Sequence, residues 1–174
     1  MLDDRVFTVP NALSLLRLFL VPVVVTLLLA GSDALAAAFF VLAALTDFLD
    51  GRLARMAGPT RLGRILDPLA DRLMLSSVAV VLAVRGLLPV WAVAILVGRD
   101  LLALVGSVVV GSKIEVNRVG KAATAVLMGA VVLLVVGSGV VGEVIFYAGF
   151  ALSIVAGLMY ARSVRRILGG WSQR

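Results

Sequence analysis

Six long apolar segments follow one another along most of the chain, and they constrain its fold more than any other feature. Their expected bounds are 12–30, 34–55, 61–84, 88–110, 118–137 and 140–164. Each is near the length of about 20 residues that an α-helix needs to cross the hydrocarbon core of a bilayer. Short breaks such as Gly31-Ser32-Asp33 and Gly137-Ser138-Gly139 mark where helices should end. We predict an all-α integral membrane protein, a single domain over 1–174 folded as a six-transmembrane-helix bundle.

The composition supports a membrane protein and narrows its chemistry. Of the 174 residues, 62% are hydrophobic and 15% are charged, against about 45–50% and about 25% in a soluble domain. The chain has no histidine and no cysteine, which excludes disulfides, thiolate metal sites and imidazole as a base or ligand. Acid–base chemistry must use Asp, Glu, Lys or Tyr, and a metal ion must be one that prefers oxygen ligands, such as Mg²⁺, Mn²⁺ or Ca²⁺.

Basic residues gather on alternate connections between the segments. The N-terminus, the second and fourth links and the C-terminus carry Arg5, Arg52, Arg55, Arg61, Arg64, Lys113, Arg118, Lys121, Arg162, Arg165, Arg166 and Arg174. The other connections carry only Arg85. By the positive-inside rule both termini are cytoplasmic, and we expect a multi-pass protein of the cell (inner) membrane. We therefore attribute the net charge of +6 to membrane topology and to contacts with anionic lipid head groups rather than to nucleic-acid binding. The acidic start of the sequence predicts that there is no cleavable signal peptide.

Four aspartates stand out within residues 46–74, a stretch that holds nine charges in an otherwise apolar chain. Asp47 and Asp50 are three residues apart near the end of the second segment. Asp67 and Asp71 are four apart near the start of the third. Both spacings put the two side chains on one helix face. A turn at Gly58-Pro59 reverses the chain, so we expect the four carboxylates to converge at the cytoplasmic end of a helical hairpin.

The cost of such a cluster favours a metal site. An Asp inside a spanning helix costs about 2.5–3.5 kcal/mol on the insertion scale, and two like charges about 4 Å apart add roughly 1–4 kcal/mol. Two divalent cations would neutralise four carboxylates. The competing interpretation is a salt-bridge network combined with close packing of small residues. Gly51, Ala54 and Gly63 favour the metal site because they leave room beside the aspartates for a ligand.

The aspartate motif resembles the signature of the CDP-alcohol phosphotransferase family. Its fixed positions read Asp47-x2-Asp50-Gly51-x2-Ala54-Arg55-x7-Gly63-x3-Asp67-x3-Asp71. The commonest form has eight residues between the Arg and the Gly, where this chain has seven, and the difference falls in the 56–60 loop. The stretches TVPNALSLLRLFLVPV and VNRVGKAAT are also similar to this family, so the resemblance covers essentially the whole chain.

The resemblance implies a six-helix membrane enzyme, expected as a homodimer, that works at the cytoplasmic face with two Mg²⁺ or Mn²⁺ ions. Members of the family break the pyrophosphate of a CDP-linked donor, transfer the phosphoryl-alcohol part to an acceptor hydroxyl and release CMP. By the resemblance Asp47 and Asp67 would bridge both metals, Asp50 would complete one site and Asp71 the other, with Asp71 also the general base. The positions expected around the CDP part of the donor are Gly51, Ala54, Arg55, Thr60 and Gly63.

Further polar residues are candidates for binding substrate. Asn11, Ser14 and Arg17 recur every three residues on the first helix. We expect Asn11 and Ser14 to contact the donor, against the alternative of a helix cap and an arginine that snorkels to the lipid surface. The cations expected to bind the acceptor are Arg99, Arg118, Lys121 and Arg162. Arg118 and Lys121 open a helix, where a phosphate is favoured, whereas Arg99 has a competing role as the internal partner of Asp100.

Several acceptor alcohols are compatible with this hypothesis. CDP-diacylglycerol is the expected donor and glycerol 3-phosphate the preferred acceptor. Phosphatidylglycerol, which would make the protein a cardiolipin synthase, and inositol phosphate are the alternatives. A small cation transporter would place its carboxylates near the bilayer midplane in broken or repeated helices, and a structural scaffold would not need small residues beside the aspartates. The sequence favours neither of these two classes.

Overall fold

The computed structural model describes residues 9–57, 63–110 and 118–169, and within these ranges the chain forms six α-helices. Their bounds are α1 Val9–Leu29, α2 Asp33–Ala57, α3 Gly63–Val84, α4 Val90–Val110, α5 Arg118–Val135 and α6 Gly139–Gly169. The six predicted helices are therefore confirmed. The first begins three residues earlier and the last ends five residues later than expected, because an apolar segment marks the part of a helix suited to lipid and not the whole helix.

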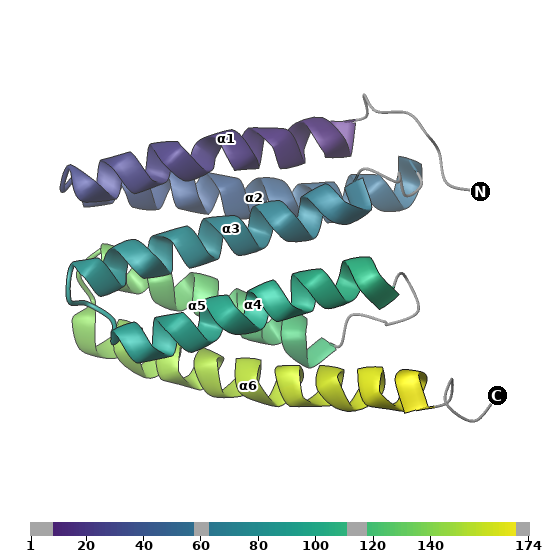
Figure 1. Ribbon diagram of the computed structural model, residues 1–174. Coiled ribbons are helices and arrows are strands. Elements are labelled where there is room, and N and C mark those ends of the chain that lie inside the picture. Colours follow the sequence, from purple (N-terminus) through teal and green to yellow (C-terminus); the bar gives the residue numbers. More distant parts are fainter. Residues whose placement is uncertain (1–8, 58–62, 111–117, 170–174) are drawn as a thin grey trace.

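The helices run along a common direction (Figure 1). The most extensive packing is that of α5 with α6 and of α1 with both α2 and α3. Helix α4 packs mainly against α3 and also contacts α6, and contacts of α5 with α2 and α3 complete the bundle. The start of α1 and the end of α6 lie at the same end of the bundle, as do the end of α2 and the start of α3 (Figure 1).

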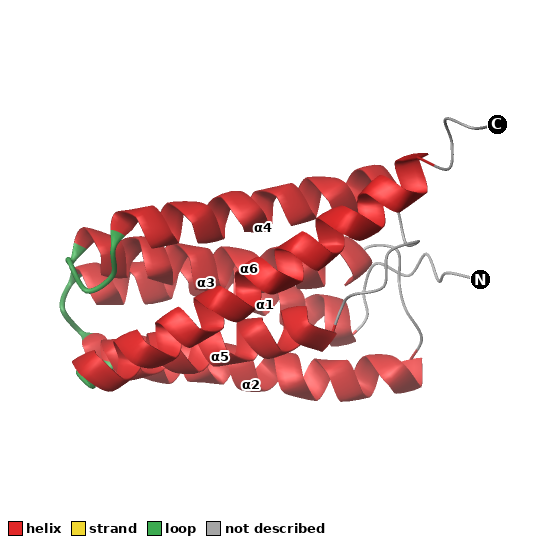
Figure 2. Cartoon of the chain, turned by 90° about the horizontal axis from the view of Figure 1, so that it is seen from below, coloured by secondary structure: helices red, strands yellow, loops and turns green. Residues whose placement is uncertain are grey.

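Three tight turns close the opposite end of the bundle (Figure 2). Each contains a glycine with a positive φ, namely Gly31 at 74°, Gly86 at 75° and Gly137 at 91°. In the first, the Ser32 N–H donates to the Leu27 carbonyl at 2.9 Å, a 6→1 bond that ends a helix in a Schellman motif. The left-handed conformation is accessible to glycine at little cost, which is why the predicted breaks at these glycines coincide with the observed helix ends.

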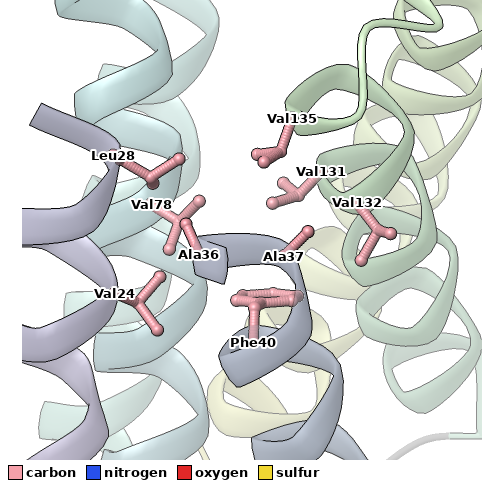
Figure 3. Close-up of a pocket in the computed structure, with 9 residues that line it drawn as sticks. All are labelled: Val24, Leu28, Ala36, Ala37, Phe40, Val78, Val131, Val132 and Val135. Atoms are coloured by element: carbon pink, nitrogen blue, oxygen red, sulfur yellow. The ribbon is translucent and has the colours of Figure 1, made fainter. Parts of the chain in front are cut away.

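The interior is apolar at the end of the bundle that carries the tight turns. Val24, Leu28, Phe40 and Val78 are all at most 3% exposed. A small cavity without polar lining lies there among α1, α2, α3 and α5 (Figure 3). Large apolar side chains also cover the outside, with Phe19 at 72% and Leu102 at 75% exposed. An outer surface of this kind suits lipid, where apolar side chains need no burial in protein.

Two helical segments within the described residues are long and apolar enough to cross a membrane, Ala12–Leu29 in α1 and Gly139–Met159 in α6. The apolar parts of α2 and α5 are shorter, covering Asp33–Thr46 and Val119–Val135. Charged residues interrupt the remaining helices, as Arg99-Asp100 does in α4. Length and composition thus identify two spans, and the crossing of the membrane by all six helices stays a prediction.

Candidate active site

Asp71, the expected general base, has a described partner on another helix. It lies on α3, where its Oδ1 forms an ion pair with Nη1 of Arg17 on α1. The Arg17 side chain is 2% exposed and that of Asp71 is 24% exposed. This burial contradicts the interpretation of Arg17 as an arginine that snorkels to the lipid surface. The packing of α1 on α3 therefore gives the expected general base a buried cationic partner.

The other three predicted metal ligands are placed by their helices alone. Asp47 and Asp50 belong to α2, and Asp67 to α3, but their side chains lie outside the described part of the chain. The end of α2 and the start of α3 share one end of the bundle (Figure 1). The donor set itself fits Mg²⁺ or Mn²⁺, since four carboxylates without nitrogen or sulfur are hard oxygen ligands. Their convergence on two cations stays a prediction.

The expected donor-binding positions divide between described and undescribed residues. Gly51, Ala54 and Arg55 lie in α2, and Gly63 is the first residue of α3. The surroundings of these four residues and the side chain of Asn11 on α1 fall outside the described part of the chain. Thr60 lies outside it altogether. Ser14 is 1% exposed and lies one helical turn before Arg17. The structure thus buries Ser14 on the same face of α1 as Arg17.

Arg99 has an intramolecular partner, as the competing interpretation proposed. Its Nη1 lies 3.2 Å from Oδ1 of Asp100, whose residue is 6% exposed. Nη1 of Arg72 on α3 donates to the backbone carbonyl oxygen of Asp100 at 2.8 Å. Arg99 also packs on α6, because a Cβ built at Gly157 would lie 3.6 Å from the Arg99 Cγ. These contacts make Arg99 and Asp100 part of the packing among α3, α4 and α6.

The remaining acceptor candidates lie on α5 and α6. Lys121 and Arg162 are exposed, whereas the side chain of Arg118 lies outside the described part of the chain. The two helices approach closely here, since a Cβ built at Gly120 would lie 3.8 Å from the Ala156 Cβ. The start of α5 and the end of α6 lie at the end of the bundle where α3 begins (Figure 1). Their role in acceptor binding stays a prediction.

Three contacts involve residues that sequence reasoning left unpaired. Arg17 binds Asp71, Arg72 binds the Asp100 carbonyl, and at the opposite end Nη1 and Nη2 of Arg85 bind the two carboxylate oxygens of Asp33 at 2.6 and 2.8 Å. The hydrogen bonds from Arg85 hold the pKa of the Asp33 carboxyl below its ordinary value. An arginine in an apolar helix needs an internal partner, which is the sequence signal that points to a partner for Arg17.

Comparison with known proteins identifies the family to which this chain is similar. A model of the CDP-alcohol phosphatidyltransferase family matches residues 7–155. The cardiolipin synthase (CMP-forming) of Streptomyces coelicolor is 41% identical over 135 residues, which cover 70% of this chain and 61% of that protein. The CDP-diacylglycerol–glycerol-3-phosphate 3-phosphatidyltransferase of Bacillus subtilis is 31% identical over 140 residues, covering 68% of this chain and 71% of that protein.

The extent of these matches establishes the family. The chain spans about three-fifths of the length of the first relatives it matches, as with a protein of Mycobacterium tuberculosis that is 40% identical over 129 residues and covered to 61%. The family model, in contrast, matches well over half of the present chain. The protein belongs to the CDP-alcohol phosphatidyltransferase family. The resemblance seen in the sequence is confirmed.

Proposed function

We propose that this protein is a membrane enzyme of phospholipid synthesis that transfers a phosphatidyl group from CDP-diacylglycerol to the hydroxyl of phosphatidylglycerol, forming cardiolipin and CMP. The observation that carries the proposal is the family's aspartate motif in a chain 41% identical to a CMP-forming cardiolipin synthase. This choice revises the acceptor preferred from sequence, glycerol 3-phosphate. The relatives named as cardiolipin synthases match this chain at higher identity than the one named for glycerol 3-phosphate.

The proposed reaction is a displacement at phosphorus. The acceptor oxygen attacks the phosphorus that carries the diacylglycerol, and the bond from that phosphorus to the bridging oxygen breaks. CMP leaves with the electron pair of that bond, and the acceptor's proton passes to Asp71. A carboxylate positioned beside the acceptor hydroxyl can act as a general base, and Asp71 is the expected one.

Asp47, Asp50, Asp67 and Asp71 would hold two Mg²⁺ or Mn²⁺ ions, an assignment supported by the all-oxygen donor set. When bound, such ions would neutralise negative charge on the pyrophosphate of the donor. Gly51, Ala54, Arg55, Thr60 and Gly63, together with Asn11 and Ser14, would hold the CDP part. Arg55 suits this role because a guanidinium can bind two phosphate oxygens at once.

The acceptor would bind where α5 begins. Arg118 and Lys121 open this helix, and a helix N-terminus with two cations favours a phosphate. The exposed Arg162 of α6 is a further candidate. Arg99 is the weakest of the four candidates, because its contacts with Asp100 and Gly157 give it a role in packing.

We further propose that all six helices cross the membrane, with both termini and the site on the cytoplasmic face, and that the enzyme is a homodimer. The distribution of basic residues supports this orientation. The single cation at the other end, Arg85, is offset by its bidentate contact with Asp33. Its charge therefore opposes the orientation less than an unpaired arginine would.

Glycerol 3-phosphate is the second candidate acceptor, and the Bacillus subtilis relative supports it. The test offers purified enzyme CDP-diacylglycerol and Mg²⁺ or Mn²⁺ with phosphatidylglycerol, glycerol 3-phosphate or inositol phosphate in separate reactions. We expect CMP and cardiolipin with phosphatidylglycerol, and their loss in Asp71→Asn. CMP with glycerol 3-phosphate alone would replace the proposed acceptor. No CMP with any acceptor from a folded, metal-binding protein would overturn the proposed activity and favour a cation-binding function.

A further inference from the structure

The ion pair of Arg17 and Asp71 joins a buried cation to a residue of the proposed reaction. Arg17 is 2% exposed and lies in α1, within the segment Ala12–Leu29 that is long and apolar enough to cross a membrane. A guanidinium keeps its proton in proteins, so its burial requires an anionic partner. Asp71 supplies one from α3, 54 residues away in sequence.

The residue after Asp71 makes a second contact on another side of α3. Arg72 donates from Nη1 to the Asp100 carbonyl of α4 at 2.8 Å. Consecutive helical residues point about 100° apart. One contact therefore ties α3 to α1 and the next ties it to α4, at the level of Asp71. Together they restrict rotation of α3 about its axis, which would swing the Asp71 carboxylate away from its present position.

We propose that Arg17 is a positioning residue for the phosphatidyl transfer. It fixes Oδ1 of Asp71 toward α1 and thereby sets the orientation in which this carboxylate meets the acceptor hydroxyl. The inference rests on the proposed function only in assigning Asp71 to the reaction. Arg17 itself contacts neither donor nor acceptor in this scheme, so its loss should lower kcat and leave the KM for CDP-diacylglycerol nearly unchanged.

The first test separates positioning from general stability. Misplacing a reacting group by about 1 Å can cost roughly 10²-fold in rate, so we expect a fall of this order in kcat for Arg17→Met at saturating Mg²⁺. Arg17→Lys restores the charge without the fork and should recover part of that rate. Arg85→Met is the matched control, since it also removes an arginine from an ion pair but at the opposite end of the bundle. It should lower the melting temperature with kcat unchanged.

A second test reads the ion pair without activity. Melting temperatures in EDTA are compared for wild type, Arg17→Met, Asp71→Asn and the double variant. Asp71→Asn leaves Arg17 buried beside a neutral group and should melt lowest, whereas the double variant should recover much of the loss because both charges are gone. Additive shifts would overturn the inference, as would a folded Arg17→Met with wild-type kcat.

The two tests also separate this inference from the proposed function. If wild type releases no CMP with any acceptor, the proposed function fails, and a coupled melting cycle still establishes that Arg17 holds Asp71. A second outcome is an active wild type with non-additive melting shifts. If Arg17→Met then loses no more kcat and melting temperature than Arg85→Met does, Arg17 has only a structural role and the positioning role is overturned. A selective loss of kcat with a coupled cycle supports it.

Discussion

At the scale of single residues, the buried hydroxyl of Ser153 should lower the stability of the bundle. Its side chain on α6 is 1% exposed, and its hydroxyl has no hydrogen-bond partner among the described residues. An unsatisfied buried hydroxyl costs about 1–3 kcal/mol. Ser153→Ala should therefore raise the free energy of unfolding by about 1 kcal/mol in a denaturation experiment in detergent.

Thr124 of α5 provides the control for that prediction. Its hydroxyl donates to the Gly120 carbonyl at 3.0 Å, so Thr124→Val removes a bond that is made, which should lower the free energy of unfolding by about 0.5–1.5 kcal/mol. Equal changes in the free energy of unfolding for Ser153→Ala and Thr124→Val would show that the hydrogen bonding of these hydroxyls does not determine their contribution to stability.

Single residues also show where sequence reasoning succeeded and where it stopped. The aspartates could be singled out because four charges in apolar helices demand a partner. The partner of Asp71 could not be found this way. Periodicity puts Asn11, Ser14 and Arg17 on one face of a helix, but it does not say which helix that face meets. That choice depends on the packing of α1 against α3, between residues 54 positions apart.

At the scale of helices, close approach of α5 and α6 depends on glycine. A Cβ built at Gly142 would lie 2.7 Å from the Leu134 Cγ and 3.0 Å from the Leu134 backbone nitrogen. Real Cβ atoms do not approach a neighbour as closely as 2.7 Å, so the Leu134 side chain or the two helices would have to shift. Gly142→Ala should destabilise the protein by about 1–3 kcal/mol, the usual range for overpacking, measured as a fall in melting temperature.

Gly129 of α5 is a matched glycine without such a contact. Nothing lies within 4 Å of a Cβ built there, and alanine favours a helix over glycine by about 1 kcal/mol. Gly129→Ala should therefore be neutral or stabilising. If Gly129→Ala lowers the melting temperature as much as Gly142→Ala does, the loss at Gly142 does not come from overpacking between α5 and α6.

Helix ends were predictable to different degrees. The turns at Gly31, Gly86 and Gly137 were found because a local motif stops a helix there. Hydropathy alone places the start of α1 and the end of α6 inside their true positions, since it fades before the helix does, and the end of α6 lies instead at Gly169 of the Gly169-Gly170 pair. Arg162, beyond the apolar part of α6, still belongs to that helix.

For the whole molecule, two observations bear on orientation. The start of α1 and the end of α6 share one end of the bundle (Figure 1), which an even number of crossings requires. The opposite end carries the tight turns and a single arginine that is paired with Asp33. Paired in this way, Arg85 adds little net charge to that end, and the basic residues of the other end are left to set the topology.

The absence of cysteine from the chain makes this orientation directly testable. Single cysteines are introduced as Ser138→Cys, in the turn before α6, and as Ser172→Cys, beyond its end. A membrane-impermeant maleimide applied to intact spheroplasts should label Ser138→Cys at once and Ser172→Cys only after the membrane is permeabilised. The reverse pattern would put the C-terminus, and with it the end of the bundle that carries the proposed site, on the outer face. Labelling of both positions in intact spheroplasts would place the two ends of α6 on the same side and so contradict a crossing of the membrane by α6.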